Sequence, residues 1–168
     1  IEPAIKPAAL QTKTNHVGVL ATQGTLSSEL FNSTSQKFSE GITIIEQIGE
    51  GVVPLIEDGK SNSKEMEKLL YRYLKPMLDK NIDYLVLGCS HYPFLIPQIK
   101  KIIGNDITII DSGQAVAKQT KAVLEKNNLL NINNSIITHK LISNADIKTL
   151  KQIVNDFQIS TSISYLNF

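Results

Sequence analysis

The sequence predicts an α/β protein built on a doubly wound parallel sheet, and two patterns indicate that class. Short apolar runs rich in Val, Ile and Leu, without strict polar alternation, occur at 17–22, 42–49, 84–88 and 107–113. Segments with the spacing of helices lie between them. Strands that are buried on both faces have continuous apolar runs, and parallel strands are joined by helical crossovers. We therefore expect helices to cover both faces of the sheet.

The first third of the chain is expected to contain two strands, one helix and two irregular segments. Residues 1–8 (IEPAIKPA) have the Pro/Ala composition of an extended connector. The strand at 17–22 ends in a Gln-Gly-Thr turn, and 27–40 follows as a helix. Residues 52–59 are expected to be irregular because Pro54 has no amide hydrogen to donate to a central strand pairing.

A longer helix is predicted to begin at Asn62, which has Glu65 three residues later, the spacing of a capping box. Pro76 is expected to kink or end this helix, because an interior proline costs about 3 kcal/mol. The apolar residues that share one face of the helix are predicted to pack on a core: Met66, Leu69, Leu70, Tyr73, Leu74 and Met77.

The remaining elements continue the alternation of strand and helix. Pro93 suits the first turn of a helix that runs through Ile103, and 115–128 is typical of another helix. The tail is richer in Asn. It is predicted to form a strand, a helix and a last strand, at 140–144, 145–157 and 160–166.

Composition limits the classes of function. The 168 residues, 42% of them apolar, can fill a core, and 17 basic against 16 acidic side chains give a net charge of +1. With no long block of either sign, nucleic acid and membrane are not expected partners. The single Cys cannot form an internal disulfide, no apolar run approaches the ~20 residues of a membrane span, and no signal sequence is present, so we expect a cytoplasmic protein. Because the chain begins with Ile1 rather than Met, we expect it to be a fragment.

Three polar residues stand at the ends of predicted strands, where parallel sheets bind ligands: Thr22, Cys89 and Asp111. Cys89 is the only cysteine, and His91 follows two positions later. This thiol is either a small buried hydrophobe or a thiolate stabilised by the imidazole and by the start of the next helix. One Cys and one His do not fill a zinc coordination shell, so no metal site is predicted.

Several other positions have two interpretations. Glu57 is either a solvated turn carboxylate or a group that orients an imidazole. Thr22 and Thr25 either cap the next helix or offer hydroxyls and amides to a carboxylate. His16 and His139 lie at strand edges, and we interpret both as surface or packing residues.

Four stretches, in this order and at these spacings, resemble the second half of the glutamate racemases, which belong to the aspartate/glutamate racemase superfamily. The resemblance extends from residue 1 to about residue 155, and its most specific part is GCSHYPFL. It implies cofactor-independent exchange of L- and D-glutamate, which supplies D-glutamate for peptidoglycan, in a cleft between two α/β lobes. The stretches are VGVLATQGTLSSELF, VPLIEDG, LVLGCSHYPFL and ITIIDSG.

The resemblance also implies a mechanism with two thiols, one on each face of the α-carbon, because inversion needs one group to remove a proton and another to return one. It implies that Cys89 is the thiol that faces the L-isomer, that His91 assists it, and that Glu57 pairs with His91. Ser90 stands where the family more often has threonine, a change that keeps the hydroxyl. The positions that the resemblance places at the substrate are Thr22, Thr25, Ser90 and His91.

The family's opening Asp-Ser-Gly loop and its first Cys-Asn-Thr loop have no counterpart in this sequence, since Asp111-Ser112-Gly113 matches a later strand. We therefore expect residues 1–113 to form the second racemase lobe and 114–168 to pack on an absent first lobe. The expected partners are glutamate and the missing N-terminal half, and a homodimer is compatible with the sequence.

Two alternatives remain open at this stage. One is an aspartate or hydantoin racemase of the same superfamily, although His91 followed by Tyr92 and Pro93 favours glutamate. The other is a non-catalytic amino-acid-binding module, if these residues are the whole gene product.

Overall fold

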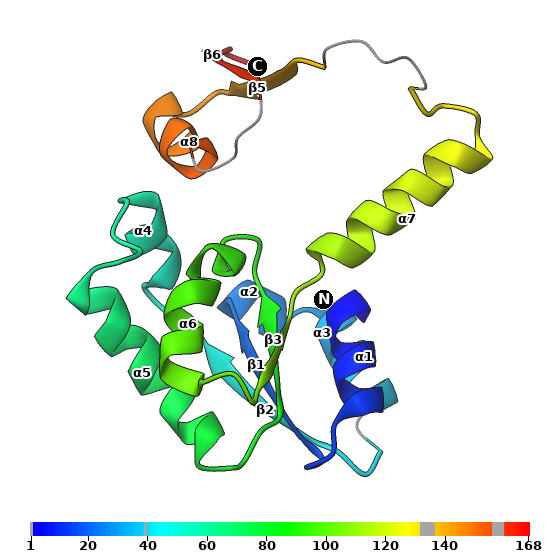
Figure 1. The fold of residues 1–168 in the computed structure, drawn as a ribbon, viewed down its shortest axis with the longest axis vertical. Coiled ribbons are helices and arrows are strands. Elements are labelled where there is room, and N and C mark those ends of the chain that lie inside the picture. The colour runs from blue at the N-terminus through cyan, green and yellow to red at the C-terminus, as the bar shows by residue number, and fades with distance from the viewer. Residues whose placement is uncertain (1, 39, 132–136, 156–159) are drawn as a thin grey trace.

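A computed structural model describes residues 2–38, 40–131, 137–155 and 160–168 of the chain (Figure 1). Its main sheet has four strands, all parallel, in the order β2-β1-β3-β4. A second sheet pairs β5 with β6, also in parallel. The strands are β1 (His16–Ala21), β2 (Thr43–Ile48), β3 (Tyr84–Gly88), β4 (Thr108–Ile110), β5 (His139–Ser143) and β6 (Thr161–Tyr165).

Helices cover both faces of the main sheet, which confirms the doubly wound α/β class (Figure 1). One face packs against α1 and α3, and the other against α4, α5 and α6. The helices are α1 (Glu2–Gln11), α2 (Gln23–Leu26), α3 (Glu29–Phe38), α4 (Val52–Glu57), α5 (Lys64–Leu78), the 3₁₀ helix η1 (Tyr92–Leu95), α6 (Ile96–Ile103), α7 (Gly113–Lys126) and α8 (Ile147–Val154).

The two-residue period of the strands divides the apolar side chains between the two faces. Val19 of β1 and Val86 of β3 are buried with Phe31 of α3. Leu20 and Leu87, the next residues in each strand, are buried with the helices of the other face. Successive side chains of a strand point to opposite faces, so a run of consecutive apolar residues suits a sheet covered on both sides.

The strand order creates a switch point between β1 and β3. The chain leaves β1 for β2 on one side and reaches β4 from β3 on the other, with the crossover helices on opposite faces. In open parallel sheets this arrangement leaves a crevice at the carboxyl ends of the two central strands. The residues after β1 and β3 therefore lie where a ligand is expected.

Two segments predicted to be irregular are helices. Residues 52–57 form α4, in which Pro54 is the third residue. The first amides of a helix have no intrahelical acceptor, so a proline there costs no hydrogen bond. The prediction was wrong because it treated the segment as a candidate strand.

The N-terminal segment is also a helix rather than an extended connector. In α1, Pro3 lies in the first turn, and Pro7 lies in the interior, where it forfeits one backbone hydrogen bond. The helix nevertheless buries a small apolar face against the sheet, which offsets that loss. The residues of this face are Ala4, Ile5, Ala8 and Ala9.

The N-cap of the longer helix, α5, lies one residue after the predicted cap, Asn62. Ser63 is the N-cap, and its hydroxyl accepts a hydrogen bond from the Met66 amide at 3.1 Å. Pro76 falls in the last turn, and the helix ends two residues later at Leu78. The predicted apolar face is confirmed, with Met66, Leu70, Leu74 and Met77 fully buried.

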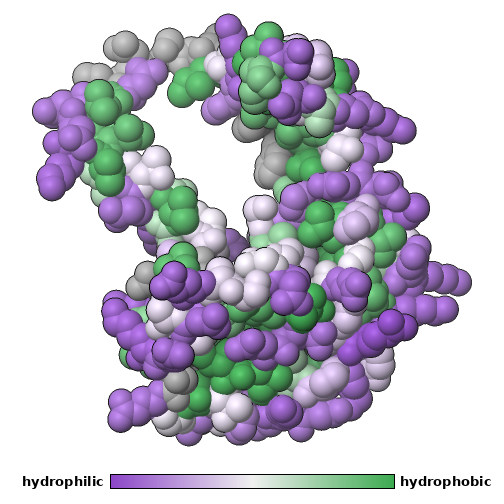
Figure 2. Space-filling model, turned by 180° about the vertical axis from the view of Figure 1, so that it is seen from behind, coloured by the Kyte–Doolittle hydropathy of each residue, from purple (hydrophilic) through white to green (hydrophobic). Residues whose placement is uncertain are grey.

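The part of the chain after β4 stands away from the sheet. No residue of α7 is buried, and Val116 and Val123 are 53% and 46% exposed. Figure 2 shows an open space between this arm and the main body, with hydrophobic side chains along the arm. The predicted strand, helix and strand of the tail are confirmed as β5, α8 and β6, although 156–159 lie outside the described residues.

No helix in the described ranges combines the length and the apolar content that crossing a bilayer requires.

Asp83 ties the loop between α1 and β1 to the residues that precede β3. Its carboxylate accepts hydrogen bonds from the Thr12 hydroxyl at 2.6 Å, the Lys13 amide at 2.6 Å and the Thr14 amide at 3.3 Å. Partial burial alone raises the pKa of Asp83, but these hydrogen bonds together outweigh burial and hold it below its ordinary value. The ionised carboxylate is therefore a stabilising feature of the folded state.

We expect Asp83→Asn to lower the free energy of unfolding by about 1–2 kcal/mol at neutral pH, because hydrogen bonds to a charged acceptor are weakened. A carboxyl whose pKa is depressed by folding stabilises the protein above its unfolded pKa, and that stabilisation is lost as the pH falls through the folded pKa. Urea unfolding at neutral pH and at about pH 3 measures this, and the difference between variant and parent should be smaller in acid. The control is Asp106→Asn, at an exposed carboxylate. A constant difference at both pH values would contradict this role of Asp83.

Candidate functional site

The candidate site lies at the carboxyl edge of the main sheet, beside the switch point. Ala21 and Gly88 are register partners at the ends of β1 and β3, so Thr22 and Cys89 leave the sheet side by side. The Thr25 hydroxyl donates to the Gly88 carbonyl at 3.0 Å and links the two loops. An open cavity of about 470 Å³ lies here. Its lining residues are Thr22, Gly24, Thr25, Ser28, Leu30, Leu87, Gly88, Cys89, Ser90 and Ser112.

His91 contacts Cys89 through one ring nitrogen and Glu57 through the other. The Cys89 Sγ is 4.0 Å from His91 Nδ1, and His91 Nε2 is 3.1 Å from Glu57 Oε1. The Ser90 hydroxyl is 3.5 Å from the same Nδ1 atom. The structure thus brings together the three residues that the sequence analysis singled out from positions up to 34 apart.

The geometry assigns different roles to the two ring nitrogens of His91. The carboxylate of Glu57 can only accept a hydrogen bond, so in the neutral ring it favours the proton on Nε2. Nδ1 is then the unprotonated nitrogen, and it faces the thiol of Cys89. The 4.0 Å contact is long for a hydrogen bond. Chemically, this arrangement can accept a proton from the thiol and return it.

Local structure explains how each of these side chains reaches the site. Glu57 is the last residue of α4, and His91 is the residue before η1. His91 is 27% exposed and Glu57 is 47% exposed, so solvent reaches both side chains. A contact this exposed to solvent contributes at most ~1 kcal/mol to stability.

The segment after the cysteine differs from the single helix that we predicted. Pro93 lies in η1, a 3₁₀ helix of four residues, and the α-helix α6 begins only at Ile96. The N-terminus of α6 is thus seven residues from Cys89 in the sequence. The start of α6 is therefore not next to the thiol in the sequence, whereas His91 Nδ1 lies 4.0 Å from Sγ.

Thr22 caps a helix, and both Thr22 and Thr25 line the cavity. The Thr22 hydroxyl accepts from the Thr25 amide at 3.3 Å as the N-cap of α2, and the two hydroxyls lie 3.0 Å apart. The Thr25 hydroxyl donates its hydrogen to the Gly88 carbonyl. The capping interpretation is therefore confirmed for Thr22 but not for Thr25, which lies inside α2, and both residues line the cavity.

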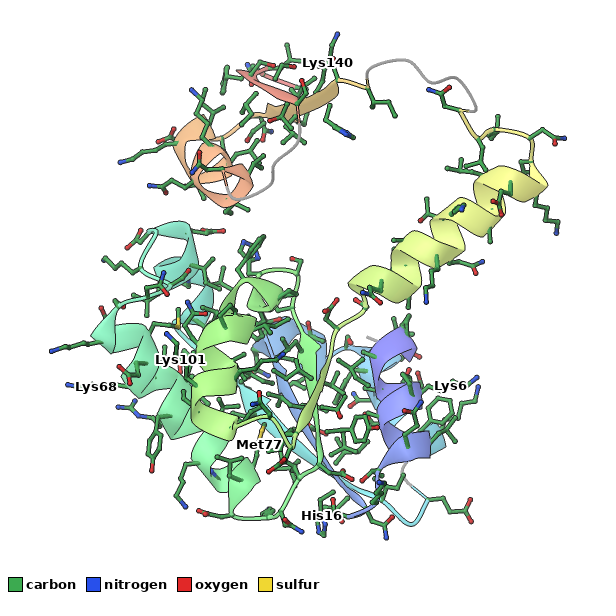
Figure 3. The ribbon with its side chains drawn as sticks, viewed as in Figure 1. Lys6, His16, Lys68, Met77, Lys101 and Lys140 are labelled. Carbon is green, nitrogen blue, oxygen red and sulfur yellow. The ribbon has the colours of Figure 1, made fainter. Side chains whose placement is uncertain are left out.

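Other predicted residues lie elsewhere. Asp111 turns back on its own loop and accepts a hydrogen bond from the Gly113 amide at 2.6 Å, and it is the following Ser112 that lines the cavity. Sequence reasoning missed Ser112, although it comes directly after a residue that was singled out. His16 bonds the Thr14 carbonyl at the opposite end of the main sheet (Figure 3), and His139 is exposed in β5.

A metal site is not found in the described part of the chain, because it has no group of three or more His, Cys, Asp or Glu side chains suitably placed.

Comparison with known proteins gives consistent results. The family model described as Asp/Glu/Hydantoin racemase matches residues 1–120. The chain is 45% identical over 130 residues to the glutamate racemase of Pseudomonas putida, covering 77% of this chain and 49% of that protein. It is 49% identical over 118 residues to the glutamate racemase of Ralstonia pickettii, covering 70% and 42%. The chain therefore spans about half the length of the curated relatives it matches.

Solved structures agree over nearly the whole chain. A glutamate racemase isoform from Bacillus anthracis superposes with a TM-score of 0.80 at 25% identity, covering 99% of this chain and 64% of that one. The Escherichia coli glutamate racemase, in complex with L-glutamate and the activator UDP-MurNAc-Ala, gives a TM-score of 0.78 at 27% identity, covering 97% and 62%.

The fold and the site define a parallel α/β protein that carries one thiol at the switch point of its sheet, with an imidazole and a carboxylate behind it. The chain belongs to the Asp/Glu/Hydantoin racemase family.

Proposed function

We propose that this chain is the part of a glutamate racemase that carries the acid/base thiol facing L-glutamate. The observation that carries the proposal is the chain of contacts from Cys89 through His91 to Glu57, beside a cavity of about 470 Å³ at the carboxyl ends of the central strands. The curated relatives at 42–49% identity are named glutamate racemases, which favours glutamate over the aspartate and hydantoin alternatives.

In this proposal His91 takes the thiol proton of Cys89 at Nδ1, and Glu57 stabilises the resulting imidazolium at Nε2. The Cys89 thiolate then removes the α-proton of L-glutamate, and the electron pair stays on the α-carbon. A second thiol on the opposite face donates its proton to that carbon and gives D-glutamate. The reverse reaction exchanges the roles of the two thiols, and no cofactor or metal takes part.

The cavity wall is proposed to hold the substrate beside the thiol. Thr22, Thr25 and Ser90 line it and carry hydroxyls that can donate to or accept from a ligand. Ser90 keeps a hydroxyl 3.5 Å from His91 Nδ1, so it can border both the substrate and the imidazole.

The second thiol is proposed to come from a preceding lobe of a longer protein, which we call the intact protein. Its existence is supported by the relatives, of which this chain spans about half. We propose that residues 1–113 form one lobe, and that 114–168 pack on the other. The exposed apolar residues of α7, among them Val116 and Val123, support that role. D-glutamate for peptidoglycan, made in the cytoplasm, is the proposed product.

The chain by itself is expected not to racemise glutamate, because one thiol can serve one face of the α-carbon only. Circular dichroism of L-glutamate incubated with the chain measures this, with a full-length glutamate racemase as the positive control. A steady loss of optical activity with the chain, absent in a Cys89→Ser sample prepared identically, would contradict the two-thiol proposal.

A further inference from the structure

Tyr92 joins two segments that are far apart in the sequence. Its side chain is fully buried, and its hydroxyl donates to the Gly49 carbonyl at 3.1 Å. Gly49 follows β2 and lies three residues before α4, whose last residue is Glu57. Burial raises the pKa of Tyr92 well above its ordinary value, so the hydroxyl stays protonated and remains a donor.

Gly49 is shaped to receive this hydroxyl. A Cβ at this position would overlap the Tyr92 hydroxyl oxygen and lie 2.9 Å from the ring carbon Cζ. Gly49 is not at a positive φ, so the close approach, and not backbone freedom, excludes a side chain here. Its amide donates to the Ala21 carbonyl at 2.9 Å, which also ties it to the end of β1.

The backbone amide of Tyr92 stabilises the turn that carries Cys89 and His91. Its amide donates to the Cys89 carbonyl at 3.2 Å and closes the turn that contains Ser90 and His91. One residue therefore fixes the turn that carries the thiol and imidazole, and also contacts the loop that leads to the carboxylate. The contact between His91 and Glu57 spans these two segments.

We propose that Tyr92 is a positioning residue: its hydroxyl, seated against Gly49, sets the separation of His91 and Glu57 and so the action of the imidazole on Cys89. The catalytic use of this positioning rests on the proposed function. The positioning itself can be tested without turnover, because Cys89 is the only cysteine of the chain and alkylation reports on that thiol alone.

The test is the rate of Cys89 alkylation by iodoacetamide at neutral pH in the 168-residue chain. We expect Tyr92→Phe to lower this rate about threefold or more, as His91→Asn does, because the thiolate loses its oriented imidazole. In a His91→Asn background, Tyr92→Phe should change the rate little, since its effect passes through His91. The control is Tyr84→Phe, which removes a phenol hydrogen bond to Gln11 on the other face of the sheet and should leave the rate unchanged.

Gly49→Ala should also lower the alkylation rate, because the added Cβ displaces the Tyr92 hydroxyl from the Gly49 carbonyl. Its effect should be smaller when combined with Tyr92→Phe, because the hydroxyl that it overlaps is gone. A cooperative melting transition above the assay temperature, measured for Tyr92→Phe and for Tyr84→Phe, establishes that both variants are folded.

The outcomes separate this proposal from the proposed function. If His91→Asn lowers the rate and Tyr92→Phe does not, only the positioning role is contradicted. The same holds if Tyr92→Phe has an equal effect with and without His91, since loosening of the loop would then explain it. If His91→Asn itself has no effect, the imidazole does not act on the thiol, and both proposals are contradicted.

Discussion

Replacing Cys89 by serine in the intact protein is expected to abolish glutamate turnover in both directions while leaving the fold intact. Serine is close to cysteine in size, but its hydroxyl is far less acidic than a thiol and does not supply an anionic base at neutral pH. The His91–Glu57 pair remains, yet the atom that faces the α-carbon no longer exchanges protons. We expect a loss of about 10³-fold or more.

The measurement is the change in optical activity of L-glutamate and of D-glutamate, with the melting temperature as the check on folding. Cys89 is half-buried at a cavity wall, so the substitution should change stability little. Cys89→Ser with more than about a tenth of the parent activity would mean that Cys89 is a structural residue, the alternative that the sequence left open.

Removing either helper of the thiol is expected to slow the reaction chiefly from L to D, where Cys89 is the abstracting base. His91→Asn should lower that rate by about 10²–10⁴, the usual contribution of general acid/base assistance. Glu57→Gln should weaken the same step, because the amide no longer favours the Nε2 proton. Because the exposed ion pair contributes at most ~1 kcal/mol, neither change should unfold the protein.

The double variant is expected to be little slower than the slower single variant, since groups that act as one unit are non-additive. Rates in each direction for both single variants and the double variant measure this, with His139→Asn as a matched control at an exposed histidine. Losses that multiply, or a loss confined to the D-to-L direction, would show that Glu57 and His91 do not act with Cys89.

Local patterns predicted the strands well, because a sheet covered on both faces leaves a continuous apolar run in each strand. They were less reliable where proline was involved. Pro54 excludes a central strand but not the first turn of a helix, and the burial of α4 against the core decided the outcome. In α1, the buried residues Ala4, Ile5 and Ala8 have helical spacing, which the prediction of an extended connector from Pro3 and Pro7 did not consider.

The site was predictable only in part for a related reason. The sequence alone placed Cys89 and Thr22 at the carboxyl ends of strands, which share one edge of a parallel sheet. That their two strands are neighbours is a finding of the structure. The contact of His91 with Glu57 depends on how α4 packs, which no local pattern contains, and only the family resemblance indicated it. The buried hydrogen bond from Tyr92 to Gly49 could not be predicted from the sequence, in which the only sign of it is a glycine at the end of a strand.

The most direct test of the central claim is the exchange of the α-proton in deuterium oxide, followed by proton NMR for each isomer of glutamate separately. In the intact protein, Cys89→Ser should lose exchange from L-glutamate and retain part of the exchange from D-glutamate, because the other thiol still serves that face. Exchange from L-glutamate at the parent rate would contradict the assignment of Cys89 as the base that faces the L-isomer.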